Sequence, residues 1–242
     1  SIEPKGIYTD LMRKFRDEGH SVYIVTPHER KFGKKTELVE CDGVKILGVK
    51  TLNIQKTNVV EKGIGTLLIE SQFKSAIKKY LAGVKFDVVF YSTPPITFTK
   101  VVQFVKCQNP QAVSYLLLKD IFPQNAVDIG MFGKKSLFYK MFRKKEVELY
   151  KNSDYIGCMS PANVKFVIEH NDFVDSSRVE VAPNSIQVDL TEKSQEQIAK
   201  ERAAIREKYS LPLDKPLFIY GGYLGKPQGI PFLIECLDAL KN

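Results

Sequence analysis

The sequence predicts an α/β fold built around a parallel sheet, and three observations support this. Short apolar runs typical of buried strands alternate along the chain with amphipathic segments of helical period. Glycine, proline or N-cap residues bound these segments, as expected at the ends of strands and helices. The composition, with 43% hydrophobic and 26% charged residues, is that of a globular protein. Strand–helix alternation of this kind places helices on the faces of a parallel sheet.

The first elements are a helix, a strand and a hairpin. In chain order we expect a helix over 7–19, a strand over 20–27 bounded by Pro27, a basic loop over 28–35 and two short strands between 36 and 50. Ile7, Leu11 and Phe15 share one side of the helix, and Gly19 ends it. The hairpin turn falls on Asp42–Gly43, a dipeptide typical of tight turns between strands.

The remaining elements continue the alternation. They are a helix over 63–83, a strand over 85–95, a helix over 96–110, a strand over 112–123, a basic helix within 133–151 and a strand over 154–161. Ser160 and Pro161 then supply the N-cap and first residue of another helix. A short strand and turn over 178–186, a charged helix over 192–212, a last strand over 216–222 and a helix over 230–240 complete the order.

Polar or small residues follow most of the expected strands. They are Thr26–Pro27, Ser92–Pro94, Lys119–Asp120, Ser160–Pro161 and Gly221–Gly222. Ligands of parallel α/β sheets bind at the carboxyl ends of the strands, so the sequence predicts a binding site among these residues.

Charge and composition narrow the possible functions. The chain has 36 Lys and Arg against 28 Asp and Glu, so it carries a net positive charge. This charge fits three kinds of binding partner equally well: nucleic acid, an anionic membrane surface and phosphorylated ligands. No run approaches the ~20 apolar residues that cross a bilayer, and the first residues lack a signal-peptide pattern. The four cysteines show no CxxC spacing and the three histidines are far apart. We therefore expect reduced thiols, a cytoplasmic location and no metal site.

Both ends of the expected order of elements are incomplete. A doubly wound sheet normally opens with a strand, and no strand precedes the expected helix over 7–19. Near the other end, a second sheet has only one expected strand, over 216–222, and one helix, over 230–240. We therefore expect the sequence to be a fragment whose first strand is missing.

Five stretches together resemble glycosyltransferases of the GT-B type, particularly the retaining family GT4. They are "GIYTDLMRKFRDEGHSVYIVTP" (6–27), "SYLLLKDIFPQNAVDIG" (114–130), "NSDYIGCMSPANVKFV" (152–167), "VEVAPNSIQVD" (179–189) and "FIYGGYLGKPQGIPFLIECLDAL" (218–240). In order they are similar to the family's "GHxVxVVT", "RDxWP", "ADxIxxxS", "PNGVD" and "GxLGxxKG" segments. The five stretches follow one another in the same order as in the family, and the resemblance extends over nearly the whole chain.

This resemblance implies an enzyme. It would transfer a sugar from a nucleotide diphosphate sugar to a hydroxyl of a lipid-linked glycan, in bacterial polysaccharide synthesis at the inner face of the cell membrane. The family needs no metal and retains the sugar's configuration. The resemblance implies a first domain over residues 1–188, which would bind the acceptor. It also implies a linker and the start of a second, donor-binding domain over 189–242. Because most of the donor domain is not in this sequence, we expect the chain by itself to be inactive.

The resemblance also implies donor-binding residues. Gly6, Gly222, Gly225 and Lys226 fall where the family approaches the donor phosphates. Glycines and helix N-termini suit diphosphate, and the alternative for the glycines is a plain turn. The family's loop arginine and lysine are replaced by Tyr223 and Gln228, which leaves Lys226 as the loop's cation.

Asp120 is the candidate catalytic residue. As a carboxylate at the mouth of the first sheet, it could accept a hydrogen bond from an acceptor hydroxyl, and Lys119 beside it could bind the acceptor. The alternative is an Asx turn within "DIFP". Three other polar residues are better explained by structural roles. We interpret Ser160 as an N-cap, Asn184 as a hinge residue that supports its own turn, and His20 as part of the helix–strand turn.

The segment over 133–151 combines apolar and basic residues. Leu137, Phe138, Met141, Phe142 and Leu149 can lie on one side of a helix. The cations among them are Lys134, Lys135, Lys140, Arg143, Lys144 and Lys145. Such a helix can lie in an anionic membrane interface or bind a lipid diphosphate, and the alternative is a helix that packs on the sheet with solvated charges.

Two other functions fit parts of the sequence. A nucleotide-sugar 2-epimerase has the same architecture, but it would need carboxylates and histidines around one nucleotide sugar, and the chain has only three histidines. A non-catalytic module that binds nucleic acid would need exposed aromatic residues interleaved with cations. The salt dependence of oligonucleotide binding, compared with liposome binding, would separate that module from a membrane-bound enzyme.

Overall fold

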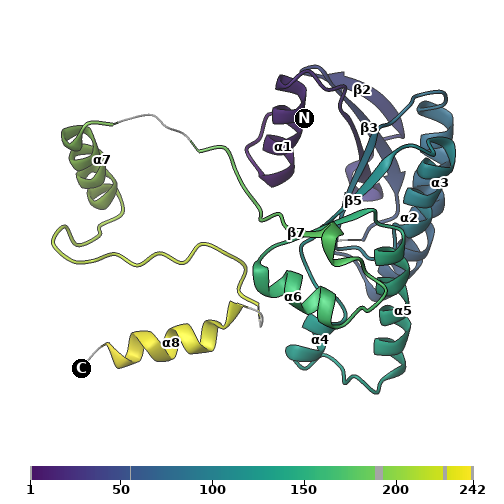
Figure 1. Cartoon of the computed structure of the whole chain (residues 1–242). Coiled ribbons are helices and arrows are strands. Elements are labelled where there is room, and N and C mark those ends of the chain that lie inside the picture. Colours follow the sequence, from purple (N-terminus) through teal and green to yellow (C-terminus); the bar gives the residue numbers. More distant parts are fainter. Residues whose placement is uncertain (1, 55, 189–192, 226–227, 241–242) are drawn as a thin grey trace. The chain divides into compact units, whose positions relative to one another are not determined.

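The computed structural model describes residues 2–54, 56–188, 193–225 and 228–240. The chain divides into two compact units, Ser1–Gln187 and Val188–Asn242 (Figure 1). The first unit is α/β, with two sheets and helices on their faces in a Rossmann-like arrangement. This confirms the predicted α/β class and the parallel strands.

The first sheet has three strands in the order β1-β3-β2. Its strands are β1 (Tyr23–Glu29), β2 (Glu37–Cys41) and β3 (Val44–Thr51), and they are flanked by α1 (Ile7–Asp17), a 3-10 turn (Arg30–Phe32) and α2 (Val59–Tyr80). β1 and β3 are parallel, whereas β2 and β3 form the predicted hairpin. Asp42 and Gly43 have φ of 51° and 71° in its turn, which glycine and aspartate tolerate well.

β3 is the central strand of this sheet and is covered on both faces. Val44 and Ile46 pack towards α1, in a cluster with Ile2 and Phe15. Leu47, on the opposite face of β3, packs against α2. A strand buried on both faces has a nearly continuous apolar sequence, which is the pattern of "VKILGV".

β1 continues through Pro27, whereas the sequence predicted that Pro27 would bound the strand. The Lys45 amide donates to the Val22 carbonyl at 3.0 Å, so even-numbered residues of β1 face β3 and odd-numbered ones face away. The nitrogen of Pro27 therefore lies on the edge of β1 that does not pair with β3. A proline is tolerated there because it removes no hydrogen bond from the ladder.

The second sheet is all parallel, in the order β4-β5-β6-β7. Its strands are β4 (Val88–Ser92), β5 (Val113–Leu118), β6 (Tyr155–Cys158) and β7 (Val179–Val181). The helices between them are α3 (Thr99–Gln108), α4 (Gln124–Asp128), α5 (Leu137–Lys151) and α6 (Pro161–Glu169), with a 3-10 turn at Ser176–Arg178. The short α4 was not expected from the sequence. Leu116 and Leu118 of β5 pack against Leu149 of α5 and Val167 of α6, which places the core on one face of the sheet.

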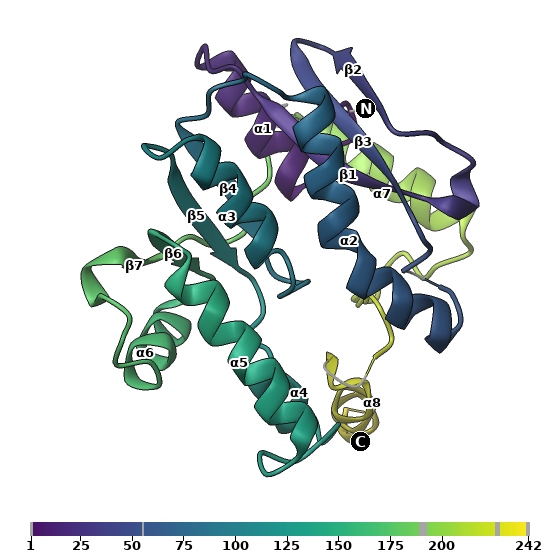
Figure 2. The same ribbon diagram turned by 90° about the vertical axis from the view of Figure 1, so that its right-hand side faces the viewer.

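α1 lies on the other face of this sheet. Its Phe15 ring is 5.2 Å from the ring of Phe90 on β4, centroid to centroid. α1 therefore packs on both sheets of the unit, and α2 and α3 lie opposite it (Figure 2). In the described part of the unit, β1 and β4 each pair on one side only.

The described part of the second unit includes α7 (Gln195–Lys208) and α8 (Ile230–Ala239). Ser194 caps α7 in a capping box with Gln197, and α8 follows Gly229, whose φ is 61°. The strand predicted over 216–222 is wrong: these residues form no strand, and the Phe218 and Ile219 side chains are 78% and 81% exposed. An apolar run becomes a strand only where another strand can pair with it, and no described residue does so here. Among the described residues, no helix is both long and apolar enough to span a bilayer.

Candidate functional site

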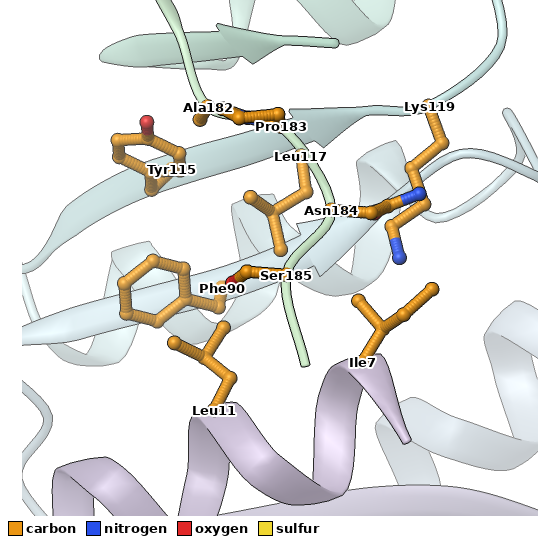
Figure 3. A pocket seen from close by; sticks show the side chains of 10 residues that line it. All are labelled: Ile7, Leu11, Phe90, Tyr115, Leu117, Lys119, Ala182, Pro183, Asn184 and Ser185. Carbon is orange, nitrogen blue, oxygen red and sulfur yellow. The ribbon is translucent and has the colours of Figure 1, made fainter. Parts of the chain in front are cut away.

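A pocket of about 300 Å³ lies between α1 and the second sheet (Figure 3). We call it the α1 pocket, and it is lined by Ile7, Leu11, Phe90, Tyr115, Leu117, Lys119, Ala182, Pro183, Asn184 and Ser185. Side chains from α1, β4 and β5 and the backbone segment after β7 form its walls. The pocket is apolar where it follows the strands, and its cation, amide and hydroxyl come from residues that follow β5 and β7.

The periodicities of strand and helix place the apolar lining. Alternate residues of a strand point to one face, so Tyr115 and Leu117 face α1 while Leu116 and Leu118 enter the core. Phe90 is opposite Tyr115 in the parallel register of β4 and β5. On α1, Ile7 and Leu11 are one turn apart and lie on one side of the helix, as the sequence predicted, and in the structure this side faces the sheet.

Tyr115 is held by a contact that crosses β6. Its hydroxyl donates a 2.5 Å hydrogen bond to Oε1 of Glu180 on β7. Gly157 lies beneath the ring, and a Cβ there would come within 2.6 Å of the Tyr115 hydroxyl oxygen. Burial, and then the hydrogen bond to the Glu180 carboxylate, raise the pKa of Tyr115 well above its ordinary value. The phenol therefore stays neutral and acts as a donor.

Lys119 is the cation of the α1 pocket. Its Nζ lies 3.7 Å from the centre of the Tyr8 ring, an arrangement that favours a cation through the negative face of the ring. The Tyr8 hydroxyl in turn donates to Oγ of Ser92, at the end of β4, at 2.7 Å. Figure 3 shows the Lys119 side chain reaching past Asn184 towards Ile7. The ammonium group is thus held at the polar side of the pocket.

Asp10 fixes the segment that closes the pocket. One carboxylate oxygen accepts from the Gly6 amide at 3.1 Å and from Arg13, and the other accepts from the Gln187 amide at 2.7 Å. The bond from Gln187, then that from Gly6, and the nearby charge of Arg13 hold the pKa of Asp10 below its usual value. Residues 182–187 are thereby tied to the first turn of α1.

Gly6 is the N-cap of α1, with an extended backbone that any residue adopts. Its amide is paired with Asp10, as described above. The role of Gly6 at donor phosphates stays a prediction. Of the other predicted donor residues, Gly222 and Gly225 belong to the second unit and are each approached by a tyrosine side chain, and Lys226 lies outside the described residues.

Asp120 follows β5 and its side chain is exposed. Its backbone amide, like that of Lys119, donates to the hydroxyl of the buried Thr93, at 3.3 Å and 3.1 Å. Among the residues that the structure describes, none bonds to the Asp120 carboxylate, so no Asx turn forms. Asp120 does not line the α1 pocket, although it is next to Lys119, which does.

Three further interpretations can be compared with the structure. Ser160 is an N-cap, because its hydroxyl accepts from the Asn163 amide at 3.2 Å. His20 lies in the helix–strand turn, with its ring 5.8 Å from that of Phe15. Asn184 does not support its own turn in the described structure: its side chain has no bonded partner there and lines the pocket.

The predicted basic helix forms as α5, but its apolar residues separate into two sets. Leu149 is buried, and Phe142 packs 4.9 Å from the ring of Phe122, whereas Leu137, Phe138 and Met141 are exposed. Two of the cations are also bound within the protein.

Arg143 donates to Glu146 at 2.7 Å and to Asn171 at 2.6 Å, and so joins α5 to the end of α6. Lys145 pairs with Glu148 at 2.9 Å. Lys134, Lys135, Lys140 and Lys144 are exposed.

Sequence reasoning did not find Tyr8, Asp10, Tyr115 or Glu180. Tyr115 and Glu180 are 65 residues apart, and only the strand register brings them together. Asp10 did carry a signal, since an aspartate among the first residues of a helix often accepts backbone amides. Among the residues that the structure describes, no group of three or more His, Cys, Asp or Glu side chains could hold a metal ion.

The fold and the pocket define a Rossmann-like α/β protein with a mixed apolar and cationic site beside its parallel sheet. No family model matches the chain. A comparison with curated proteins likewise finds no significant match.

Proposed function

We propose that the chain is part of a glycosyltransferase of the GT-B type and that its first unit binds the acceptor in the α1 pocket. The observation that carries the proposal is the position of Lys119, whose ammonium lies over Tyr8 at the end of the α1 pocket formed by residues that follow the carboxyl ends of β5 and β7. This is where ligands of such sheets bind. The five family-like stretches of the sequence support the same assignment.

The lining of the α1 pocket suits a phosphorylated sugar. Its volume of about 300 Å³ is at the lower end of ligand sites, and most of its wall is apolar. Phe90 and Tyr115 offer flat aromatic surfaces on which a sugar ring can pack. Lys119, Asn184 and Ser185 offer a cation, an amide and a hydroxyl for phosphate and sugar hydroxyls.

In this proposal Asp120 accepts a hydrogen bond from the acceptor hydroxyl that attacks the donor. Its exposed carboxylate has no bonded partner among the described residues, so it is open to a ligand. The donor would be a nucleotide diphosphate sugar, with Gly222, Gly225 and Lys226 as the proposed phosphate-binding residues. Cations and helix-terminal amides would stabilise the departing diphosphate.

A titration of the isotope-labelled chain, followed by NMR, tests the acceptor site. The probe is a short-chain alkyl diphosphate sugar, with UDP and GDP in parallel titrations. We expect saturable shifts of the Lys119, Asn184 and Ser185 amides with the alkyl diphosphate sugar, and weaker affinity in Lys119→Met, which keeps the apolar stem. Lys85→Met, at an exposed lysine before β4, is the matched control. Absence of shifts at the pocket, or equal affinity in Lys119→Met, contradicts the proposal.

A further inference from the structure

The connection between α4 and α5, with the first turns of α5, carries an exposed surface that is both apolar and basic. We call it the α5 tip. Its apolar members are Met131, Leu137, Phe138 and Met141, and its cations are Lys134, Lys135, Lys140 and Lys144. All eight side chains are exposed to solvent.

The apolar residues of the α5 tip are not part of the core. Leu137, Phe138 and Met141 are 82%, 64% and 51% exposed, whereas Phe142 packs against Phe122 and Leu149 is buried. Leu137 and Met141 are four residues apart and share the outer side of the helix. Contiguous exposed apolar side chains mark a surface that binds a partner or a membrane.

The charge of the α5 tip has one sign. Residues 129–145, "IGMFGKKSLFYKMFRKK", contain six cations and no carboxylate. Arg143 and Lys145 are bound within the protein. The four lysines of the tip form no hydrogen bond or ion pair with any described residue. Their charge is therefore available to an anionic partner.

The position of the α5 tip leaves it open to a flat surface. In Figure 2 the chain between α4 and α5 forms a loop that projects past both helices and away from the sheet. α4 follows the end of β5, so α5 begins on the carboxyl side of the second sheet and runs back towards the start of β6. The tip therefore lies on the same side of the sheet as Lys119 and Asp120, which follow β5.

We propose that the α5 tip docks on the interface of an anionic bilayer. Leu137, Phe138 and Met141 enter the boundary between headgroups and acyl chains, and the four lysines contact anionic headgroups. The apolar members are two methionines, a leucine and one phenylalanine, which suits acyl chains. Nucleic acid would instead be met by several aromatic side chains interleaved with the cations. This inference goes beyond sugar transfer and does not depend on it.

A tryptophan reporter tests insertion directly, because the chain has no tryptophan. Phe138→Trp is mixed with vesicles of phosphatidylcholine alone or of equal parts phosphatidylcholine and phosphatidylglycerol. We expect a blue shift of its emission with the anionic vesicles only, and loss of the shift at high salt. The matched control is Phe173→Trp, at an exposed aromatic residue between Asp172 and Asp175, where we expect no shift. An unshifted Phe138→Trp spectrum, or an equal shift in both variants, overturns the proposal.

Vesicle co-sedimentation tests the charges. Each cation near an anionic surface contributes ~1 kcal/mol, so replacing Lys134, Lys135, Lys140 and Lys144 by Gln should weaken binding by more than about tenfold. The same replacement at Lys78, Lys79, Lys85 and Lys165, which are exposed elsewhere, gives the same net charge and should leave binding nearly unchanged. Equal loss in both variants would show a response to net charge alone and overturn the assignment to the tip.

The apolar members are tested in the same assay. Leu137→Ser combined with Met141→Ser should weaken binding to anionic vesicles, while thermal unfolding stays unchanged because both side chains are exposed. A single-stranded oligonucleotide is included as a competitor. If the chain binds the oligonucleotide through these lysines and does not bind vesicles, the surface belongs to nucleic acid and the proposal is wrong.

Discussion

Glu180 on β7 accepts a hydrogen bond from the Tyr115 hydroxyl on β5, across the intervening strand β6. The bond can cross because the β6 residue at this point is Gly157, which has no side chain. The relationship joins β5 to β7 over β6. It also fixes the aromatic ring that forms one wall of the α1 pocket.

Gly157→Ala should therefore disturb the pocket. The added Cβ would lie 2.6 Å from the Tyr115 hydroxyl oxygen and 2.7 Å from Cβ of Ala182, so both would have to move. We expect a loss of about 1–3 kcal/mol in the free energy of unfolding, measured by chemical denaturation. Gly133→Ala is the control, since a Cβ there meets nothing within 4 Å. An unchanged Gly157→Ala variant would mean that the Tyr115 contact is not formed in solution.

Asp10→Asn should release the segment over 182–187. The carboxylate accepts from two backbone amides and from Arg13, and an amide side chain cannot replace all of these bonds. We expect hydrogen exchange of the Gln187 amide to become at least about tenfold faster, whereas amides in the centre of β5 keep their protection. Asp17→Asn, on the exposed end of α1, is the control, and equal acceleration in both variants would contradict the role of Asp10.

The packed Phe142 and the exposed Phe138 of α5 should respond differently to truncation. Phe142 packs against Phe122 and Phe132, so Phe142→Ala should cost about 2–4 kcal/mol of unfolding free energy. Phe138 is mostly exposed, and Phe138→Ala should stay within about 0.5 kcal/mol of the parent. Thermal or chemical unfolding measures both. Similar costs at the two positions would show that the tip of α5 is packed, and would weaken its assignment to a membrane.

Asp154 should contribute to the acid sensitivity of the fold. Burial raises the pKa of its carboxyl, but the bonds from Lys106 and Ser114 outweigh burial and leave the pKa below its ordinary value of 3.8. A carboxyl whose pKa is depressed by folding stabilises the protein above its ordinary pKa, and this contribution is lost as the pH falls through the folded value.

The parent should therefore exceed Asp154→Asn in stability by ~1–2 kcal/mol at neutral pH, since the site is partly exposed. The difference should shrink as the pH falls below about 4. Denaturant titrations at several pH values measure it, with Asp87→Asn as an exposed control. A difference that does not vary with pH would contradict the pairing of Asp154 with Lys106.

Most elements of the first unit could be predicted because their signals are local. The face of α1 with Ile7, Leu11 and Phe15, and the turn at Asp42–Gly43, depend on residues close in sequence. The strand expected over 216–222 failed for the opposite reason. Its apolar run has the local character of a strand, but forming one requires a partner strand that no local pattern reveals.

The candidate site was predictable only in part. Lys119 could be found because it follows an expected strand, whose carboxyl end is where ligands bind. Asp120 was chosen by the same reasoning but does not line the pocket, and its role stays a prediction. The contact of Lys119 with Tyr8, and that of Tyr115 with Glu180, depend on how α1 and the strands are placed in space. Spacing along the chain carries no trace of either contact.

Pro27 limits what could lengthen the three-stranded sheet. Because its nitrogen carries no hydrogen and points to the open edge of β1, an incoming strand would find donors at Tyr23 and Val25 but none at Pro27. Any added strand could therefore pair with the amides of Tyr23 and Val25, but it would lack one hydrogen bond of the ladder at Pro27. A single ring in the backbone thus weakens one position in any pairing along this edge.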